Sequence, residues 1–81
     1  MYAVVFTYSF DSDCAIYPQK SLEDAVDFLR KSYIEEMRID VEENGWLTEG
    51  KIEEDGMYAE IRNDFGDRVD ITRFHIGNIY E

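Results

Sequence analysis

One long amphipathic segment, between residues 22 and 43, constrains the fold of this chain more than any other feature. Its apolar residues recur at intervals of three and four, the period of an α-helix with a single apolar face. They are Leu22, Val26, Leu29, Tyr33 and Met37, with Ile34 and Val41 beside them. Ser21 and Asp24 resemble a capping box, and Asn44-Gly45 predicts the helix end. A helix with one apolar stripe predicts a sheet that covers that stripe.

After Gly45 the sequence changes to the two-residue period of β-strands. Asp55-Gly56 is typical of a two-residue hairpin turn, which would join Glu54 to Met57. On one face of the hairpin, the resulting register sets Lys51 opposite Glu60 and Glu49 opposite Arg62. On the other face it sets Ile52 opposite Ala59 and Gly50 opposite Ile61. A slip of one residue would lose both pairs of opposite charges.

The residues before the helix predict two strands. Residues 2–9 alternate, and both of their faces are apolar near Val5, so we expect this strand inside the sheet. Asp11-Ser12-Asp13 predicts a turn, and residues 14–17 predict a short returning strand. Pro18 is expected to end that strand.

The last strand is predicted from Val69 to Ile76. Its apolar residues change from odd to even positions, which predicts a β-bulge at Thr72–Arg73. The tail is expected to pack through Ile79 and Tyr80. The element order is therefore ββαβββ, in a single α+β domain over residues 1–81 with one long helix packed on an antiparallel sheet.

Charge sets the class of partner. The chain has 19 acidic and 8 basic residues, a net charge of −11, which disfavours direct binding to nucleic acid or to an anionic membrane. Residues 35–60 carry ten acids and two bases, so a partner protein is expected to be basic. Cys14 is the single cysteine, and no apolar run is long enough for a membrane span. We therefore expect a cytoplasmic protein.

No catalytic, cofactor or metal site is predicted. Cys14 lies beside Asp11 and Asp13, which disfavour a thiolate, and nothing in the sequence supports a Cys14–His75 dyad over a buried thiol and a partly exposed histidine ring. Asp40 begins a pattern that imitates a calcium loop, but Lys51 stands where that loop needs a bidentate glutamate. The expectation is that the chain is not an enzyme.

Two groups of residues are candidates for contact with a partner. Trp46, Phe28 and Ile39 fall outside the helix stripe and could form an exposed apolar patch, unless the helix is covered on both sides or Trp46 fills the helix–sheet junction. The second group is acidic and lies at the helix end and in the following hairpin: Glu42, Glu43, Glu49, Glu53, Glu54 and Asp55. These acids either form a docking surface or only keep the protein soluble.

Two functions remain open. The first is a small protein-binding module, of an accessory or inhibitor type, that docks on a basic surface and in its sharpest form mimics a nucleic acid. The second is a small-ligand or enzymatic domain, whose pocket would have to be built between two copies because one helix on one sheet leaves little room.

Most of the chain, through YAVVFTYSFDSD, SLEDAVDFLRKSY, RIDVEENGW and IGNIYE, resembles a group of short acidic hypothetical proteins from gut Gram-positive bacteria, some near mobile elements. The resemblance implies a cytoplasmic accessory or phage-associated role. It implies no activity and assigns no site residues.

Overall fold

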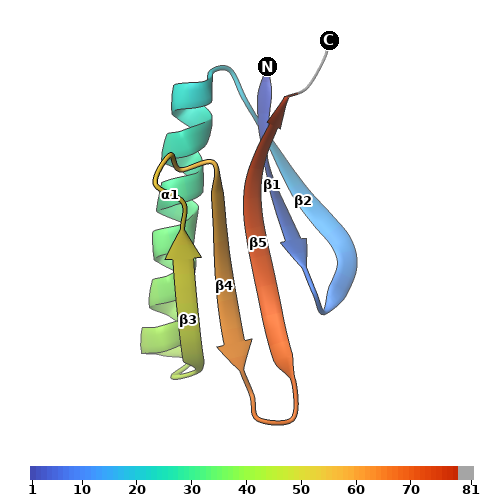
Figure 1. The fold of residues 1–81 in the computed structure, drawn as a ribbon, viewed down its shortest axis with the longest axis vertical. Coiled ribbons are helices and arrows are strands. Elements are labelled where there is room, and N and C mark those ends of the chain that lie inside the picture. The colour runs from blue at the N-terminus through green and yellow to red at the C-terminus, as the bar shows by residue number, and fades with distance from the viewer. Residues whose placement is uncertain (79–81) are drawn as a thin grey trace.

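The computed structural model describes residues 1–78, which form a five-stranded antiparallel sheet with one long helix packed on it (Figure 1). The strand order across the sheet is β2-β1-β5-β4-β3. This architecture confirms the α+β fold and the ββαβββ order. The elements are β1 (Tyr2–Tyr8), β2 (Asp11–Gln19), α1 (Leu22–Arg38), the π-helical turn η1 (Ile39–Glu43), β3 (Leu47–Ile52), β4 (Tyr58–Asp64) and β5 (Val69–Asn78).

The helix begins and ends where the sequence predicts. The Ser21 hydroxyl accepts a hydrogen bond from the Asp24 backbone N–H at 3.1 Å, which satisfies one free donor of the first turn. α1 continues into η1 up to Glu43, and Gly45 follows with a φ of 66°, a conformation that glycine adopts without strain. The added residue of a π-helical turn shifts the direction in which the last side chains point.

The core lies between α1 and the middle of the sheet. Leu29 and Phe74 are at most 1% exposed, and the Phe74 ring meets Phe6 edge to face at 4.6 Å between centroids. The other fully buried apolar residues are Val4, Ala25, Ala59 and Ile61.

The prediction of the helix stripe was partly wrong. Leu22, Ile34 and Val41 are 40%, 66% and 46% exposed, whereas Ala25 is fully buried. The buried face is centred on Ala25 and Leu29, so α1 is rotated about its axis relative to the predicted stripe. This rotation brings one flank of the helix over β1 and β2 and leaves the other flank, with Ile34, uncovered.

The hairpin register is confirmed, because β3 and β4 pair Glu49 with Arg62 and Lys51 with Glu60. Gly50 in β3 lies under the side chains of Tyr33 and Met37, where any Cβ would collide with both. The turn is longer than the predicted two residues. The Glu53 N–H donates to the Tyr58 carbonyl at 2.8 Å, which leaves residues 54–57 as the loop.

The pairing of the hairpin on its helix-facing side is also confirmed, with Ile52 opposite Ala59 and Gly50 opposite Ile61. Gly56 has a φ of 75°, but Asp55 does not have a positive φ, so the turn differs from the one that an Asp-Gly pair most often forms.

Two predictions about the other strands were wrong. β2 begins at Asp11 and continues through Pro18 to Gln19, because it is an edge strand, where a residue without a backbone N–H costs no ladder bond. β5 runs without the predicted bulge, in unbroken register with both β1 and β4. Its odd-numbered Val69 and Ile71 therefore face away from the helix. The predicted packing of Ile79 and Tyr80 lies outside the described residues.

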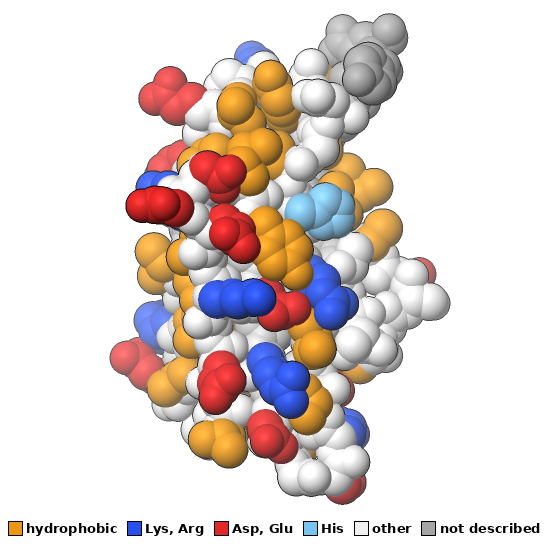
Figure 2. Space-filling model, in the orientation of Figure 1, with side chains coloured by type: hydrophobic (Ala, Val, Ile, Leu, Met, Phe, Trp, Pro, Cys, Tyr) orange, Lys and Arg blue, Asp and Glu red, His pale blue; other side chains and the backbone are white. Residues whose placement is uncertain are grey.

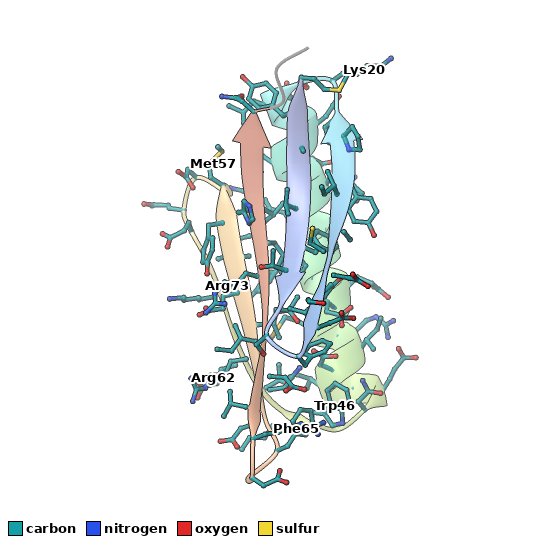
Figure 3. The ribbon with its side chains drawn as sticks, turned by 90° about the vertical axis from the view of Figure 1, so that its right-hand side faces the viewer. Lys20, Trp46, Met57, Arg62, Phe65 and Arg73 are labelled. Carbon is teal, nitrogen blue, oxygen red and sulfur yellow. The ribbon has the colours of Figure 1, made fainter. Side chains whose placement is uncertain are left out.

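The face of the sheet opposite α1 carries charged side chains (Figure 2). We call it the open face, because no second helix covers it within residues 1–78. Glu60 of β4 lies between Lys51 of β3, at 3.7 Å, and Arg73 of β5, at 3.3 Å. Arg62 and Arg73 point away from the helix (Figure 3).

Candidate functional site

Three segments that are distant in sequence lie towards the end of the molecule where the helix ends: the β1–β2 turn, η1 and the β4–β5 turn (Figure 1). They enclose a cleft of about 390 Å³. We call it the end cleft. Its lining residues are Tyr8, Phe10, Glu36, Asp40, Asn44, Trp46, Asn63, Phe65, Arg68, Asp70 and Thr72.

The floor of the end cleft is a buried polar chain. Asp40 is 2% exposed and accepts a hydrogen bond from the Asn63 side-chain amide at 3.1 Å. The amide oxygen of Asn63 accepts in turn from the Thr48 hydroxyl at 2.6 Å. No buried side-chain nitrogen or oxygen in this row of hydrogen bonds lacks a partner, so the carboxylate of Asp40 is held in a fixed position.

Glu36 lies one helical turn before Asp40 and also lines the cleft. Burial raises the pKa of the Glu36 carboxyl, and the negative charge of Asp40 raises it further. Asp70 contributes a third carboxylate from β5. A cation that entered the cleft would relieve the repulsion between Glu36 and Asp40 and favour the ionised form of Glu36.

The rim of the end cleft is aromatic. Trp46 meets Phe65 edge to face, with the ring centroids 5.0 Å apart, and Figure 3 shows the two side chains together at this end of the molecule. The guanidinium of Arg68 lies 5.0 Å from the centre of the Phe65 ring and 3.6 Å from the Asp70 carboxylate. A guanidinium thus already finds both an aromatic face and a carboxylate at this rim.

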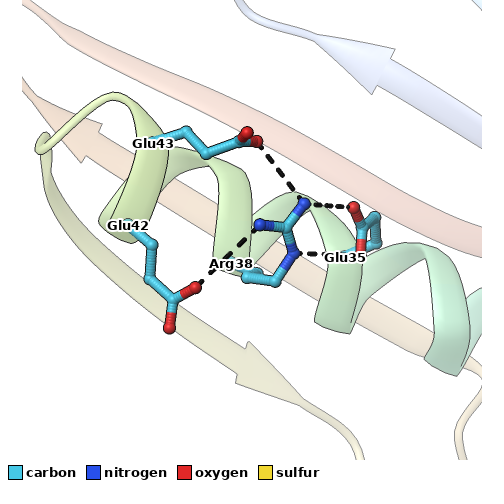
Figure 4. A network of polar contacts seen from close by, with 4 residues as sticks. All are labelled: Glu35, Arg38, Glu42 and Glu43. Carbon is cyan, nitrogen blue, oxygen red and sulfur yellow. Dashed lines mark hydrogen bonds and ion pairs between the residues drawn. The ribbon is translucent and has the colours of Figure 1, made fainter.

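Glu42 and Glu43 lie beside the end cleft, on η1, and both contact the guanidinium of Arg38 (Figure 4). Arg38 lies 3.9 Å from Glu42, 3.4 Å from Glu43 and 2.6 Å from Glu35. These three acids raise the pKa of the Arg38 guanidinium, and the largest cause is the hydrogen bonding that Arg38 donates to the Glu35 carboxylate. The negative charge at the helix end is therefore partly balanced within the protein.

The other predicted acids are not gathered with Glu42 and Glu43. Glu53, Glu54 and Asp55 lie in the β3–β4 turn, where the Glu54 carbonyl accepts a hydrogen bond from Arg30 in the middle of α1. β3 separates the two groups, and its six residues span roughly 20 Å. Glu49 lies between them on the open face, in a shallow hollow with Leu47, Arg62 and Asp64. The predicted acidic surface is therefore two separate groups with Glu49 between them.

The three predicted apolar anchors also separate. Trp46 is 41% exposed and lies at the rim of the end cleft. Ile39 is half-buried at the start of η1. Phe28 is half-buried, which matches the alternative that this side of the helix is covered. Its ring stacks on Phe6 and is tilted against Tyr17, because β1 and β2 extend under that flank of the helix.

Sequence reasoning missed Glu36, Asn63 and Asp70. One local signal was present, since Glu36 and Asp40 continue the spacing of the buried helix face and place acids where apolar residues would be expected. Asn63 and Asp70 carried no comparable signal, because only the pairing of β4 with β5 brings them together.

The described part of the chain holds no group of three His, Cys, Asp or Glu residues arranged to bind a metal ion. Among the same residues, no helix is long and apolar enough to cross a membrane. Comparisons of the chain with protein-family models, with curated proteins and with solved structures gave no match.

Proposed function

We propose that this chain is a small protein-binding module that docks on a basic partner and receives one cationic side chain of that partner in the end cleft. The observation that supports this proposal most directly is the combination of three carboxylates, Glu36, Asp40 and Asp70, with an aromatic rim in a single cleft. Carboxylates and aromatic faces are the two groups that bind guanidinium and ammonium ions.

The charge of the whole protein supports the same class of partner. A net charge of −11 attracts a basic surface from a distance and raises the rate of encounter. Long-range attraction does not select a binding mode, however, and exposed ion pairs contribute little affinity. A partly buried cleft supplies what the exposed acids lack, because it removes water from the charges that it binds.

Mimicry of a nucleic acid would be one form of this docking. It would use Glu42 and Glu43 at one end of β3 and Glu53–Asp55 at the other. A mimic would therefore engage a groove long enough to reach both groups. Competition between this protein and DNA or RNA for the same partner would separate mimicry from docking through the end cleft alone.

Trp46 gives a direct test, because it is the only tryptophan and lies at the cleft rim. We would titrate the protein with short arginine-rich peptides and follow tryptophan fluorescence, with a glycine–serine peptide of equal length as reference. Arginine peptides should change the emission saturably, and the change should weaken as salt is raised. Glu36→Gln should weaken the binding several-fold, because it removes a carboxylate from the cleft.

Glu54→Gln is the matched control, since it makes the same change in charge within the distant β3–β4 turn. This variant should bind like the native chain. The proposal fails if arginine peptides cause no saturable change, or if Glu36→Gln and Glu54→Gln weaken binding equally. Equal weakening would mean that only the net charge matters.

A further inference from the structure

The two edges of the sheet differ in how well they could pair with another strand. β2 forms one edge and contains Pro18, which has no N–H, and two charges of the same sign, Asp11 and Asp13. β3 forms the other edge, contains no proline, and has two charges of opposite sign, Glu49 and Lys51. Proline and like charges prevent edge strands from pairing, whereas opposite charges attract in a suitable register, so β3 is the less protected edge.

The free backbone groups of β3 can be identified from its turn. The Glu53 N–H donates to Tyr58 in β4, and backbone groups alternate in direction along a strand. The odd-numbered residues of β3 therefore bond to β4. The even-numbered residues Thr48, Gly50 and Ile52 direct their N–H and C=O groups to the free edge, and Gly50 and Ile52 are exposed.

These directions limit how β3 could pair with β3 of a second copy. In a two-fold antiparallel pair, even-numbered residues must face even-numbered residues. Two such registers overlap five residues of the strand. One is centred on Glu49 and sets Glu49 against Glu49, whereas the other is centred on Gly50 and sets Glu49 against Lys51. Only the second register pairs opposite charges, and it does so twice because of the symmetry.

The surroundings of this edge suit the second register. Glu49 makes no ion pair with any residue from 1 to 78, so its carboxylate is available to a second copy. Leu47 is 71% exposed, and Ile52 is 38% exposed. Ile34 of α1 is 66% exposed and lines a hollow beside Ile52. Leu47 lies at the start of the free edge on the open face, whereas Ile52 and Ile34 lie at its other end on the helix-facing side, so exposed apolar side chains flank this edge at both ends.

We propose that two copies of this chain pair through β3, antiparallel and centred on Gly50, so that their sheets join into one continuous antiparallel sheet. In this dimer, Gly50 exchanges both of its backbone hydrogen bonds with Gly50 of the second copy. Glu49 of each copy lies opposite Lys51 of the other. The interface is small, so the dimer dissociates on dilution.

The first test is sedimentation velocity of the full chain over a range of concentrations at about 150 mM salt, where the Debye length is about 8 Å and the repulsion between two acidic copies is screened. The native chain should change from monomer to dimer as its concentration rises. Glu49→Lys and Lys51→Glu should each raise the dimer dissociation constant by about tenfold or more, because each replaces two attractive pairs with repulsive ones.

Mixing the two variants tests the register itself. The E49K chain presents two lysines on the edge and the K51E chain presents two glutamates, so the mixture should form a heterodimer that neither variant forms alone. Asp67→Lys changes the net charge as Glu49→Lys does but lies in the β4–β5 turn, away from the β3 edge, and it should dimerise like the native chain. A native chain that stays monomeric, single variants that dimerise normally, or a mixture without heterodimer would each overturn the proposal.

Amide hydrogen exchange of the native chain decides the matter if a variant fails to fold. The amides of Gly50 and Ile52 should exchange more slowly at high protein concentration than at low concentration, since dimerisation gives them partners. The amides of Glu49 and Lys51 already bond to β4 and should not change. Exchange at Gly50 that is independent of concentration would overturn the proposal.

Discussion

The two faces of the sheet are built from the same five strands but depend on different interactions. On the face covered by α1, Ala59, Ile61 and Phe74 are at most 1% exposed, and apolar contact holds the layers together. On the open face, Lys51, Glu60 and Arg73 form a row of ion pairs that remains in contact with water. Burial of apolar surface is worth several kcal/mol per large side chain, whereas a surface ion pair contributes about 0–1 kcal/mol. The stability of this domain therefore resides on the covered face, and the open face is free to carry other properties.

The largest effect should come from Phe74→Ala. The ring is 1% exposed and contacts Phe6 and Tyr33, so its removal leaves a cavity and should lower the free energy of unfolding by about 3–5 kcal/mol. Ile71→Ala is the control, because Ile71 is half-buried on the open face of the same strand. Urea unfolding followed by circular dichroism measures both. Equal losses would mean that the two faces do not differ in the way described.

A smaller effect is expected from Asn63→Ala, which tests whether the covered face also depends on hydrogen bonds. This change leaves Asp40 and Thr48 without their partner at the floor of the end cleft, and should cost about 1–3 kcal/mol of unfolding free energy. Asn44→Ala is the comparison, because Asn44 lines the same cleft but is exposed. If the two variants unfold at the same urea concentration, the buried chain of hydrogen bonds does not stabilise the fold.

Glu60→Gln should have a smaller effect still, although it removes the acid that both Lys51 and Arg73 contact. The expected loss is below about 1 kcal/mol, and most of it should disappear in 1 M salt, because exposed ion pairs are screened. Thermal unfolding at low and high salt provides the measurement. A loss above 2 kcal/mol that salt does not change would show that the open face contributes as much as a buried layer.

The last prediction concerns pH, and here the substitution should stabilise the fold, whereas the three preceding ones should destabilise it. The pKa of Glu36 is raised in the folded state by burial and by Asp40, so the stability that its protonated form provides is present below the ordinary carboxyl pKa. That stability is lost as the pH rises through the raised pKa. Glu36→Gln should therefore unfold at a higher urea concentration than the native chain at pH 7, and the difference should shrink towards pH 4. A difference that grew on acidification would contradict the assigned pKa direction.

Local signals predicted the elements whose determinants are local. Ser21 and Gly45 bounded the helix, and the charges of Lys51 and Glu60 fixed the hairpin register, because each depends on residues within one element or one turn. Pro18 was misread for the opposite reason. Its tolerance depends on β2 being at the edge of the sheet, and the order of strands is set by contacts between distant segments.

The end cleft could not be predicted, since its walls come from three segments that the fold brings together. Trp46 was singled out as an exposed apolar residue, but its neighbour Phe65 comes from the β4–β5 turn, 19 positions later in the sequence. The environment of Phe28 stayed open in the sequence, because periodicity gives the width of an apolar face but not how far the sheet extends under it. The rotation of α1 over the sheet is a tertiary property.

Arg68 has a consequence for any ligand of the end cleft. It lies on the ring of Phe65 and beside Asp70, where the guanidinium of a partner would make the same contacts. The chain therefore carries its own competitor, tethered by a short turn at a high effective concentration. An incoming cation must first displace Arg68 from these contacts. The affinity of the cleft for a cation is therefore reduced in proportion to the fraction of molecules in which Arg68 occupies the rim. A chain with Arg68→Ser should consequently bind the same arginine peptide more tightly, because the Phe65 ring and the Asp70 carboxylate become free and a repelling positive charge is removed.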